Sequence, residues 1–72
     1  MQIIFSDHAI ERMSEREISK LQVYATVKNS QNKLKSFRDR TIYKRVYNLK
    51  TLEVITKLEN KKIIIISAYM VK

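Results

Sequence analysis

The sequence contains no cysteine, glycine, proline or tryptophan, and it has a single histidine. Without cysteine the chain can form neither a disulfide nor a thiolate metal site, and one histidine argues against a structural zinc site. No N-terminal signal is visible, and the longest apolar run, Ile63 to Ile66, is far shorter than the roughly 20 residues of a membrane span. We therefore expect a soluble, cytoplasmic protein with no segment in a membrane.

Several catalytic signatures are also missing. The sequence has no Walker loop, no paired-cysteine motif, no G-x-S-x-G motif and no acidic cluster with magnesium-site spacing. These absences argue against nucleotide-driven and metal-dependent chemistry. We expect a protein with no cofactor and no bound metal.

The charge is strongly positive and unevenly distributed. With 72 residues the chain has room for one domain, residues 1–72, and its formal net charge is +8 with a pI near 10. Residues 1–32 carry four basic and four acidic side chains, whereas residues 33–72 carry eleven basic and three acidic ones. A polyanionic partner, nucleic acid or an anionic membrane surface, is therefore favoured, the alternative being a lysine-rich surface that serves solubility.

Two helices are predicted from capping residues, because glycine and proline are absent. Ser6 fits the N-cap of a first helix, and Ser19 with Gln22 has the form of a capping box. This second helix, from about Lys20 to Asn29, is apolar along two stripes that include Leu21, and we expect it to be well buried. The first helix presents an apolar face of Ala9, Ile10 and Met13.

Three strands are predicted from the hydrophobic pattern that follows. They are Thr41–Asn48, Thr51–Leu58 and Lys62–Val71, with a fourth possible around Leu34 to Phe37; Gln2–Phe5 fits either a strand or a hydrophobic lead-in. Loops this short make consecutive strands antiparallel, and Asn60 is the residue best able to take a positive φ in the last one. The fold class is thus α+β, with two N-terminal helices packed on one face of a three- to four-stranded antiparallel sheet.

The segment from Ser6 to Ser19 stacks like charges in an unusual way. On a helix, His8, Arg12 and Arg16 follow one another at i,i+4 spacing, which costs a few tenths of a kcal/mol per like-charged pair. Pairs such as Arg12 with Glu15 relieve part of this repulsion. The segregation of charge suggests an anion that meets the basic stripe.

His8 and the two arginines could perform acid–base chemistry on a phosphate. An imidazole transfers protons near neutral pH, and guanidinium groups bind phosphate through paired hydrogen bonds. Metal-independent RNA cleavage needs a base, an acid and cations for the developing charge. The alternatives are that His8 is a surface spacer, and that Glu15, Glu17 or a strand carboxylate pairs with the arginines.

A second proton-transfer group would have to come from Tyr69, Tyr43 or a lysine. Tyr69 is otherwise a core residue whose hydroxyl reaches the edge of the sheet. The strand segment Tyr43, Lys44, Arg45 and Tyr47 combines aromatic rings with cations, the composition of single-stranded nucleic-acid grooves. Plain cross-strand aromatic packing explains the same tyrosines, and either face of this strand could be the inner one.

The spelling S-x-H-A-x-x-R-M-x-x-R-x-I-S from Ser6 to Ser19 resembles the family known as domain of unknown function 4258. The segments Leu52 to Ile55 and Ile64 to Tyr69 resemble its other blocks. That family has been grouped with metal-independent ribonucleases of the RelE, barnase and colicin type and often looks toxin-like. The resemblance implies an RNA substrate, no cofactor and a neutralising antitoxin.

By this resemblance His8, Arg12, Arg16 and Tyr69 match the family's polar motif positions. The family commonly has glycine where this chain has Glu17. With Glu17 the helix end is either strained by roughly 1 kcal/mol or differently shaped.

The leading functional prediction is a toxin-like, metal-independent endoribonuclease. In it His8 transfers the proton, Arg12 and Arg16 bind the scissile phosphate, and Tyr69 assists. Two other hypotheses are a non-catalytic nucleic-acid-binding module, such as a small plasmid or viral accessory protein, and an adaptor whose basic sheet meets an acidic protein.

Overall fold

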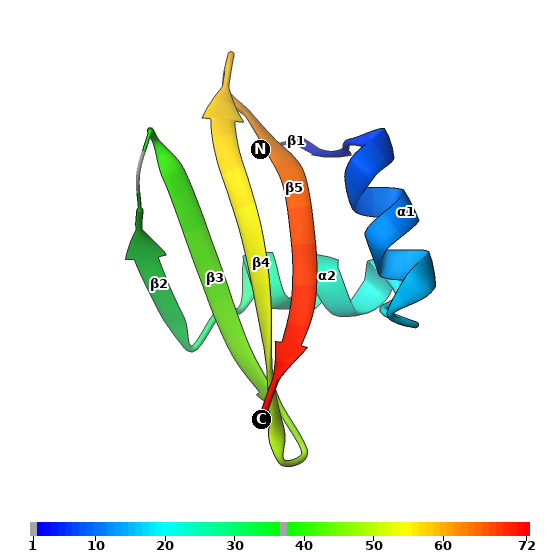
Figure 1. Cartoon of the computed structure of the whole chain (residues 1–72). Coiled ribbons are helices and arrows are strands. Elements are labelled where there is room, and N and C mark those ends of the chain that lie inside the picture. The colour runs from blue at the N-terminus through cyan, green and yellow to red at the C-terminus, as the bar shows by residue number, and fades with distance from the viewer. Residues whose placement is uncertain (1, 37) are drawn as a thin grey trace.

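A single sheet of five strands carries both helices in the computed structural model, which describes residues 2–36 and 38–72 (Figure 1). The strand order is β1-β5-β4-β3-β2, in which β1 pairs parallel to β5 and the other neighbours are antiparallel. The elements in chain order are β1 (Gln2–Phe5), α1 (Asp7–Glu15), α2 (Lys20–Lys28), β2 (Asn32–Lys35), β3 (Arg40–Tyr47), β4 (Lys50–Glu59) and β5 (Lys62–Val71).

The α+β class is confirmed, but the expected sheet was wrong in two respects. The observed sheet has five strands. It is mixed because Gln2–Phe5 forms a strand that precedes both helices and pairs in parallel with Lys62–Ile65. A hairpin cannot join parallel strands, so the whole chain from α1 to β4 forms the connection between β1 and β5. The possible fourth strand exists as Asn32–Lys35, and Phe37 lies outside the described residues.

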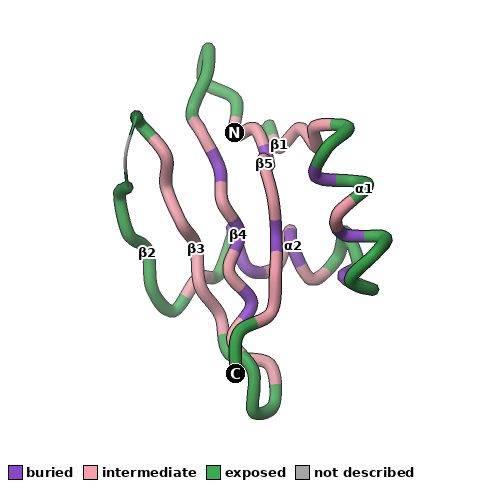
Figure 2. Tube along the Cα trace, viewed as in Figure 1, coloured by how far each residue is buried: buried purple, intermediate pink, exposed green. Residues whose placement is uncertain are grey.

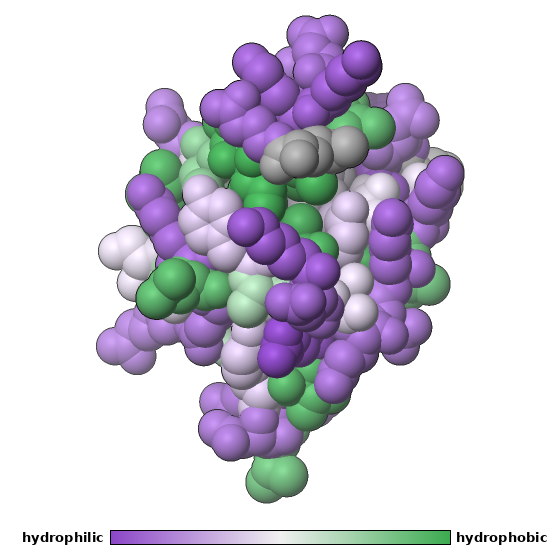
Figure 3. All heavy atoms as spheres, turned by 180° about the vertical axis from the view of Figure 1, so that it is seen from behind, coloured by the Kyte–Doolittle hydropathy of each residue, from purple (hydrophilic) through white to green (hydrophobic). Residues whose placement is uncertain are grey.

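The two helices take different positions relative to the sheet. In Figure 1, α2 lies behind the sheet, where it contacts β3 and β4, whereas α1 runs beside β5. Seen from the helix side, hydrophilic side chains cover much of the surface, and hydrophobic ones show between them, chiefly in the upper middle of the view (Figure 3). We call the side that α2 covers the helix-covered face and the opposite side the open face.

The first helix is tied to the sheet at both ends. At its start, the Ser6 hydroxyl accepts from the Ala9 amide at 3.1 Å and donates to the Ile65 carbonyl at 2.8 Å, which confirms Ser6 as the N-cap. At its end, the Ile18 amide donates to the Met13 carbonyl at 2.9 Å and the Glu17 amide to Ser14 at 3.3 Å. These bonds form a Schellman motif in which Glu17, at φ 56°, occupies the left-handed position that favours glycine.

The second helix confirms its capping box, since Ser19 and Gln22 bond each other's backbone amides. Its buried residues are Val23, Thr26 and Val27, which recur at i, i+3 and i+4 and therefore face the sheet. Leu21 was expected to be buried and is 80% exposed, because it lies on the opposite side of the helix.

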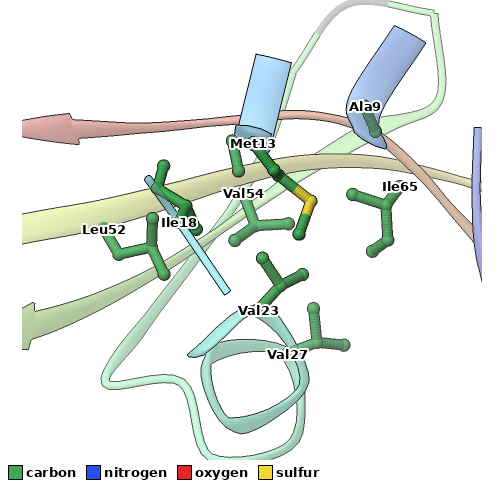
Figure 4. Packing of buried hydrophobic residues seen from close by; sticks show 9 residues of the cluster. Ala9, Met13, Ile18, Val23, Val27, Leu52, Val54 and Ile65 are labelled. Carbon is green, nitrogen blue, oxygen red and sulfur yellow. The ribbon is translucent and has the colours of Figure 1, made fainter. Parts of the chain in front are cut away.

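The core lies between the sheet and the two helices. Figure 4 shows Met13 of α1 reaching toward Val23 of α2, between Val54 and Ile65 of the sheet. Buried positions gather on α1, α2, β4 and β5, while β2 is exposed throughout (Figure 2). The buried apolar residues are Ala9, Met13, Ile18, Val23, Val27, Leu52, Val54, Ile65 and Ala68.

A β-bulge changes the alternation of β5. The β4–β5 hairpin turns at Asn60 and Lys61, both at positive φ, and its register shifts by one residue between Ile55 and Thr56. On β5 the residue without a partner in this register is Ile66. Because a one-residue slip exchanges the two faces of a strand, Ile65 and Ala68 both join the core, and Tyr69 comes to the open face.

Candidate nucleic-acid site

Three side chains from adjacent strands meet on the open face. Lys44 of β3 lies opposite Glu53 of β4, and Glu53 lies opposite Tyr69 of β5. The Tyr69 hydroxyl donates to Glu53 Oε1 at 3.0 Å, and Lys44 Nζ lies 3.9 Å from Glu53 Oε2. The Glu53 carboxylate is therefore held between a hydrogen-bond donor and a cation.

Arg16 adds a second cation at the edge of this group. It is the C-cap of α1, and the Schellman motif that follows it aims the chain back toward the sheet. Arg16 Nη1 donates to the Ala68 carbonyl at 2.9 Å and to the Ser67 hydroxyl at 3.5 Å. Its positive charge thus lies next to Tyr69, and we call Arg16, Lys44, Glu53 and Tyr69 the open-face cluster.

The cluster changes the acidity of its tyrosine. Burial raises the pKa of Tyr69 above the ordinary value of 10.0, and the hydrogen bond to Glu53 and that carboxylate's charge raise it further, against a lowering by Arg16. At neutral pH the hydroxyl therefore keeps its proton. Tyr69 can donate a hydrogen bond or a proton, but it cannot act as a base in its resting state.

A shallow hollow of about 210 Å³ adjoins the cluster on the open face. Lys44 and Glu53 belong to its lining together with Val46, Thr51 and Val71, and the side of β2 contributes Gln31 and Asn32. Among the described residues, no three histidine, aspartate or glutamate side chains come together as metal ligands. The site is built from cations, one carboxylate and hydroxyl groups.

Comparison with protein-family models matches residues 5–70 to the family described as Domain of unknown function (DUF4258). The chain belongs to this family. The resemblance noted in the sequence is thereby confirmed, while the suggested relation to RelE, barnase and colicin remains a prediction. Searches of curated proteins and of solved structures found no match.

The four residues that the sequence resemblance matched to polar motif positions divide into two groups in the structure. Arg16 and Tyr69 belong to the open-face cluster, whereas Arg12 pairs with Glu15 through an Nη1–Oε1 distance of 2.9 Å. His8 is exposed in the first turn of α1, about 12 Å from Arg16 along the helix axis at 1.5 Å per residue. The described contacts do not join His8 to the cluster.

The predicted aromatic and basic strand of this DUF4258 chain is also split between two faces. Tyr43 and Arg45 lie opposite the buried Val54 and Leu52, so they point toward the helix-covered face, and Tyr47 follows the same alternation. Lys44 alone reaches the open face. The four residues therefore do not form one surface.

Contacts beneath α2 show what two of these inner residues, Arg45 and Tyr47, do. The Tyr47 hydroxyl donates to the Gln22 carbonyl at 3.3 Å, and Arg45 Nη1 donates to the Ala25 carbonyl at 3.5 Å. The guanidinium carbon of Arg45 also lies 5.6 Å from the centre of the Tyr47 ring. These contacts fasten α2 to β3 and give Arg45 and Tyr47 a structural role.

Glu53 is the member of the cluster that the sequence did not reveal. If the strands paired uniformly from the two-residue turn at Asn60 and Lys61, Glu53 would lie opposite Ala68 and Tyr69 would point toward the core. The bulge at Ile66 moves each partner by one residue and brings Tyr69 opposite Glu53. No turn residue or glycine marks this bulge, so the sequence contained no signal for the pair.

In the part of the chain that the structure describes, neither helix is long and apolar enough to cross a membrane.

Proposed function

We propose that this DUF4258 chain is a metal-independent endoribonuclease that binds RNA on the open face and cleaves it at the open-face cluster. The observation that carries the proposal is the Tyr69–Glu53 hydrogen bond between the cations Arg16 and Lys44. The net charge of +8 and the resemblance to RelE- and barnase-type ribonucleases support RNA as the substrate.

The cluster holds the groups that cleavage of an RNA strand needs. Glu53 takes the proton of the ribose 2′-hydroxyl, whose oxygen attacks the adjacent phosphorus and forms a 2′,3′-cyclic phosphate. The bond from phosphorus to the 5′ oxygen breaks, and Tyr69 gives its proton to that leaving oxygen. Arg16 and Lys44 stabilise the negative charge that develops on the phosphate.

The rest of the strand is bound by cations that share the open face with Lys44. Arg40 lies four residues from Lys44 on β3, about 13 Å away at 3.3 Å per residue, and opposite Lys57 of β4. This row replaces the predicted track of Tyr43, Arg45 and Tyr47, whose side chains lie on the helix-covered face. The antitoxin implied by the family resemblance remains part of the proposal, as an acidic protein that would compete for the same cations.

The test measures RNA cleavage by purified variants of the protein with EDTA present. Glu53→Gln keeps the size of the side chain but cannot accept the proton, and we expect RNA cleavage to fall by about 10² to 10⁴. Glu59→Gln makes the same change in a carboxylate at the hairpin end, 3.1 Å from Lys57, and is expected to leave cleavage within about threefold.

His8→Ala decides between the open face and the α1 stripe that the sequence suggested. Because His8 is not joined to the cluster, we expect its removal to lower cleavage less than about tenfold. If His8→Ala abolishes cleavage while Glu53→Gln retains it, the chemistry lies on α1 and the assignment to Glu53 is wrong.

Binding without cleavage is the second candidate function. It is favoured because the groups of the cluster already have partners: Glu53 is hydrogen-bonded to Tyr69 and ion-paired with Lys44, and Arg16 is hydrogen-bonded to a backbone carbonyl. This candidate predicts RNA affinity that falls steeply with salt and no product from any RNA, with or without EDTA.

A further inference from the structure

The hollow beside Glu53 has the size of a small binding pocket. Its volume of about 210 Å³ lies below the roughly 300–1,000 Å³ of pockets that hold drug-sized ligands. Val46 and Val71 supply apolar walls that are 52% and 39% exposed. The hollow therefore has room for one flat ring system, and it shares Lys44 and Glu53 with the open-face cluster.

Gln31 presents a fixed polar group at this hollow. Strand β2 begins at Asn32, which pairs with Lys44, so Val46 lies past the end of β2. The Gln31 side chain takes the place of the missing strand, and its Oε1 accepts from the Val46 amide at 3.0 Å. Because a backbone N–H can only donate, the carbonyl oxygen of the amide must face it, which leaves the Gln31 NH₂ group for a ligand.

We propose that this hollow binds one nucleobase of the RNA and makes cleavage base-selective. The proposal rests on the function proposed above, because the strand must lie on the open face. The base inserts between Val46 and Val71, and its acceptor atoms receive hydrogen bonds from the Gln31 NH₂ group and from Thr51. Unpaired RNA bases are read in this way through their edges. Since Lys44 and Glu53 line both places, the neighbouring phosphate reaches the cluster.

The test maps cleavage ends on an unstructured RNA that contains all four bases equally. For the wild type, we expect ends to collect next to one base at least about fivefold over the others. Gln31→Met has similar size and cannot donate, and it is expected to reduce this preference at least threefold; total cleavage is measured alongside the preference. Gln2→Met makes the same change at an exposed position on β1, at the opposite edge of the sheet, and should alter neither quantity.

Thr51→Val is a second variant that keeps a β-branched side chain in β4, and it should also weaken the preference. Wild-type ends distributed evenly over the four bases would overturn the base pocket and leave the ribonuclease standing. If both Gln31→Met and Thr51→Val keep the wild-type base preference, the base pocket is overturned and the ribonuclease again stands.

If the protein does not cleave RNA, its affinity for RNA tests the base pocket. If RNA is bound but not cut, the comparison uses the four homopolymeric tetranucleotides; equal affinities overturn the pocket, and a preference lost in Gln31→Met supports it. If no RNA is bound even at low salt, the proposed function fails and the base pocket fails with it.

Discussion

The Tyr69 hydroxyl donates a hydrogen bond to Glu53 Oε1 across the β4–β5 pair, at an O–O distance of 3.0 Å. The two residues face each other because Ile66 is an extra residue in β5 that shifts the register by one. Without that shift Tyr69 points into the core, as strict alternation requires. The bulge thus creates the contact on which the proposed chemistry depends, in agreement with the frequent occurrence of bulges beside functional sites.

The first prediction concerns the stability that this hydrogen bond confers. Tyr69→Phe removes the donor and keeps the ring, and we expect the free energy of unfolding to fall by about 1 kcal/mol at pH 7. The folded state raises the pKa of Tyr69, so it holds the proton more tightly than the unfolded chain. The stability from this linkage is present below pH 10 and is lost as the pH rises through the folded-state pKa.

Urea unfolding of wild type and Tyr69→Phe between pH 7 and pH 11 measures both effects. The difference between the two proteins should shrink above pH 10. Tyr24→Phe is the control, since its ring packs edge-on against Phe5. A difference that stays constant across this pH range would contradict a raised pKa of Tyr69 in the folded protein.

The second prediction concerns Glu17, which holds the left-handed end of α1 at φ 56°. Glycine adopts this conformation without a clash from Cβ, and Glu17→Gly should stabilise the fold by about 1 kcal/mol. For a chain of this size, that gain raises Tm by about 4–8 °C. Glu17→Ala removes the same carboxylate but keeps Cβ, so thermal unfolding of this control should show no comparable gain; equal gains would place the effect in the charge.

The third prediction concerns the row of cations on the open face. Each phosphate contact with single-stranded RNA contributes about 0.7 to the slope of log K against log salt. Arg40→Gln should therefore lower the magnitude of this slope by about 0.7. Lys33→Gln is the matched control, because Lys33 lies opposite Tyr43 and above its ring on the helix-covered side, 5.6 Å from the centroid. A drop in slope for Lys33→Gln alone would place the RNA on the helix-covered face and contradict binding on the open face.

Local signals predicted much of the fold. Ser6, Ser19 and Gln22 form the expected caps, Asn60 takes the expected positive φ, and β5 has the expected bounds. These features depend on residues close together in the chain. Pairing partners depend on the whole fold, which is why the parallel contact of Gln2–Phe5 with β5 was not foreseen.

The site was predicted only in part for the same reason. Arg16 and Tyr69 were expected together and lie together, although Arg16 follows the helix as its C-cap. The inner position of Tyr43 and Arg45 depends on which face α2 covers, and periodicity alone does not decide that. The pairing of Glu53 with Tyr69 depends on a bulge that no turn residue in the sequence indicates.

The most direct test of the account is an NMR footprint of RNA on the two faces of β3. A 2′-O-methyl RNA, which cannot be cleaved through its 2′ oxygen, is titrated into the labelled protein at low salt with EDTA. We expect the side-chain signals of Lys44, Glu53 and Tyr69 to shift with RNA, while those of Tyr43 and Tyr47 on the helix-covered face do not. Shifts confined to His8, Arg12 and the exposed side of α1, with Lys44 and Glu53 unchanged, would contradict it.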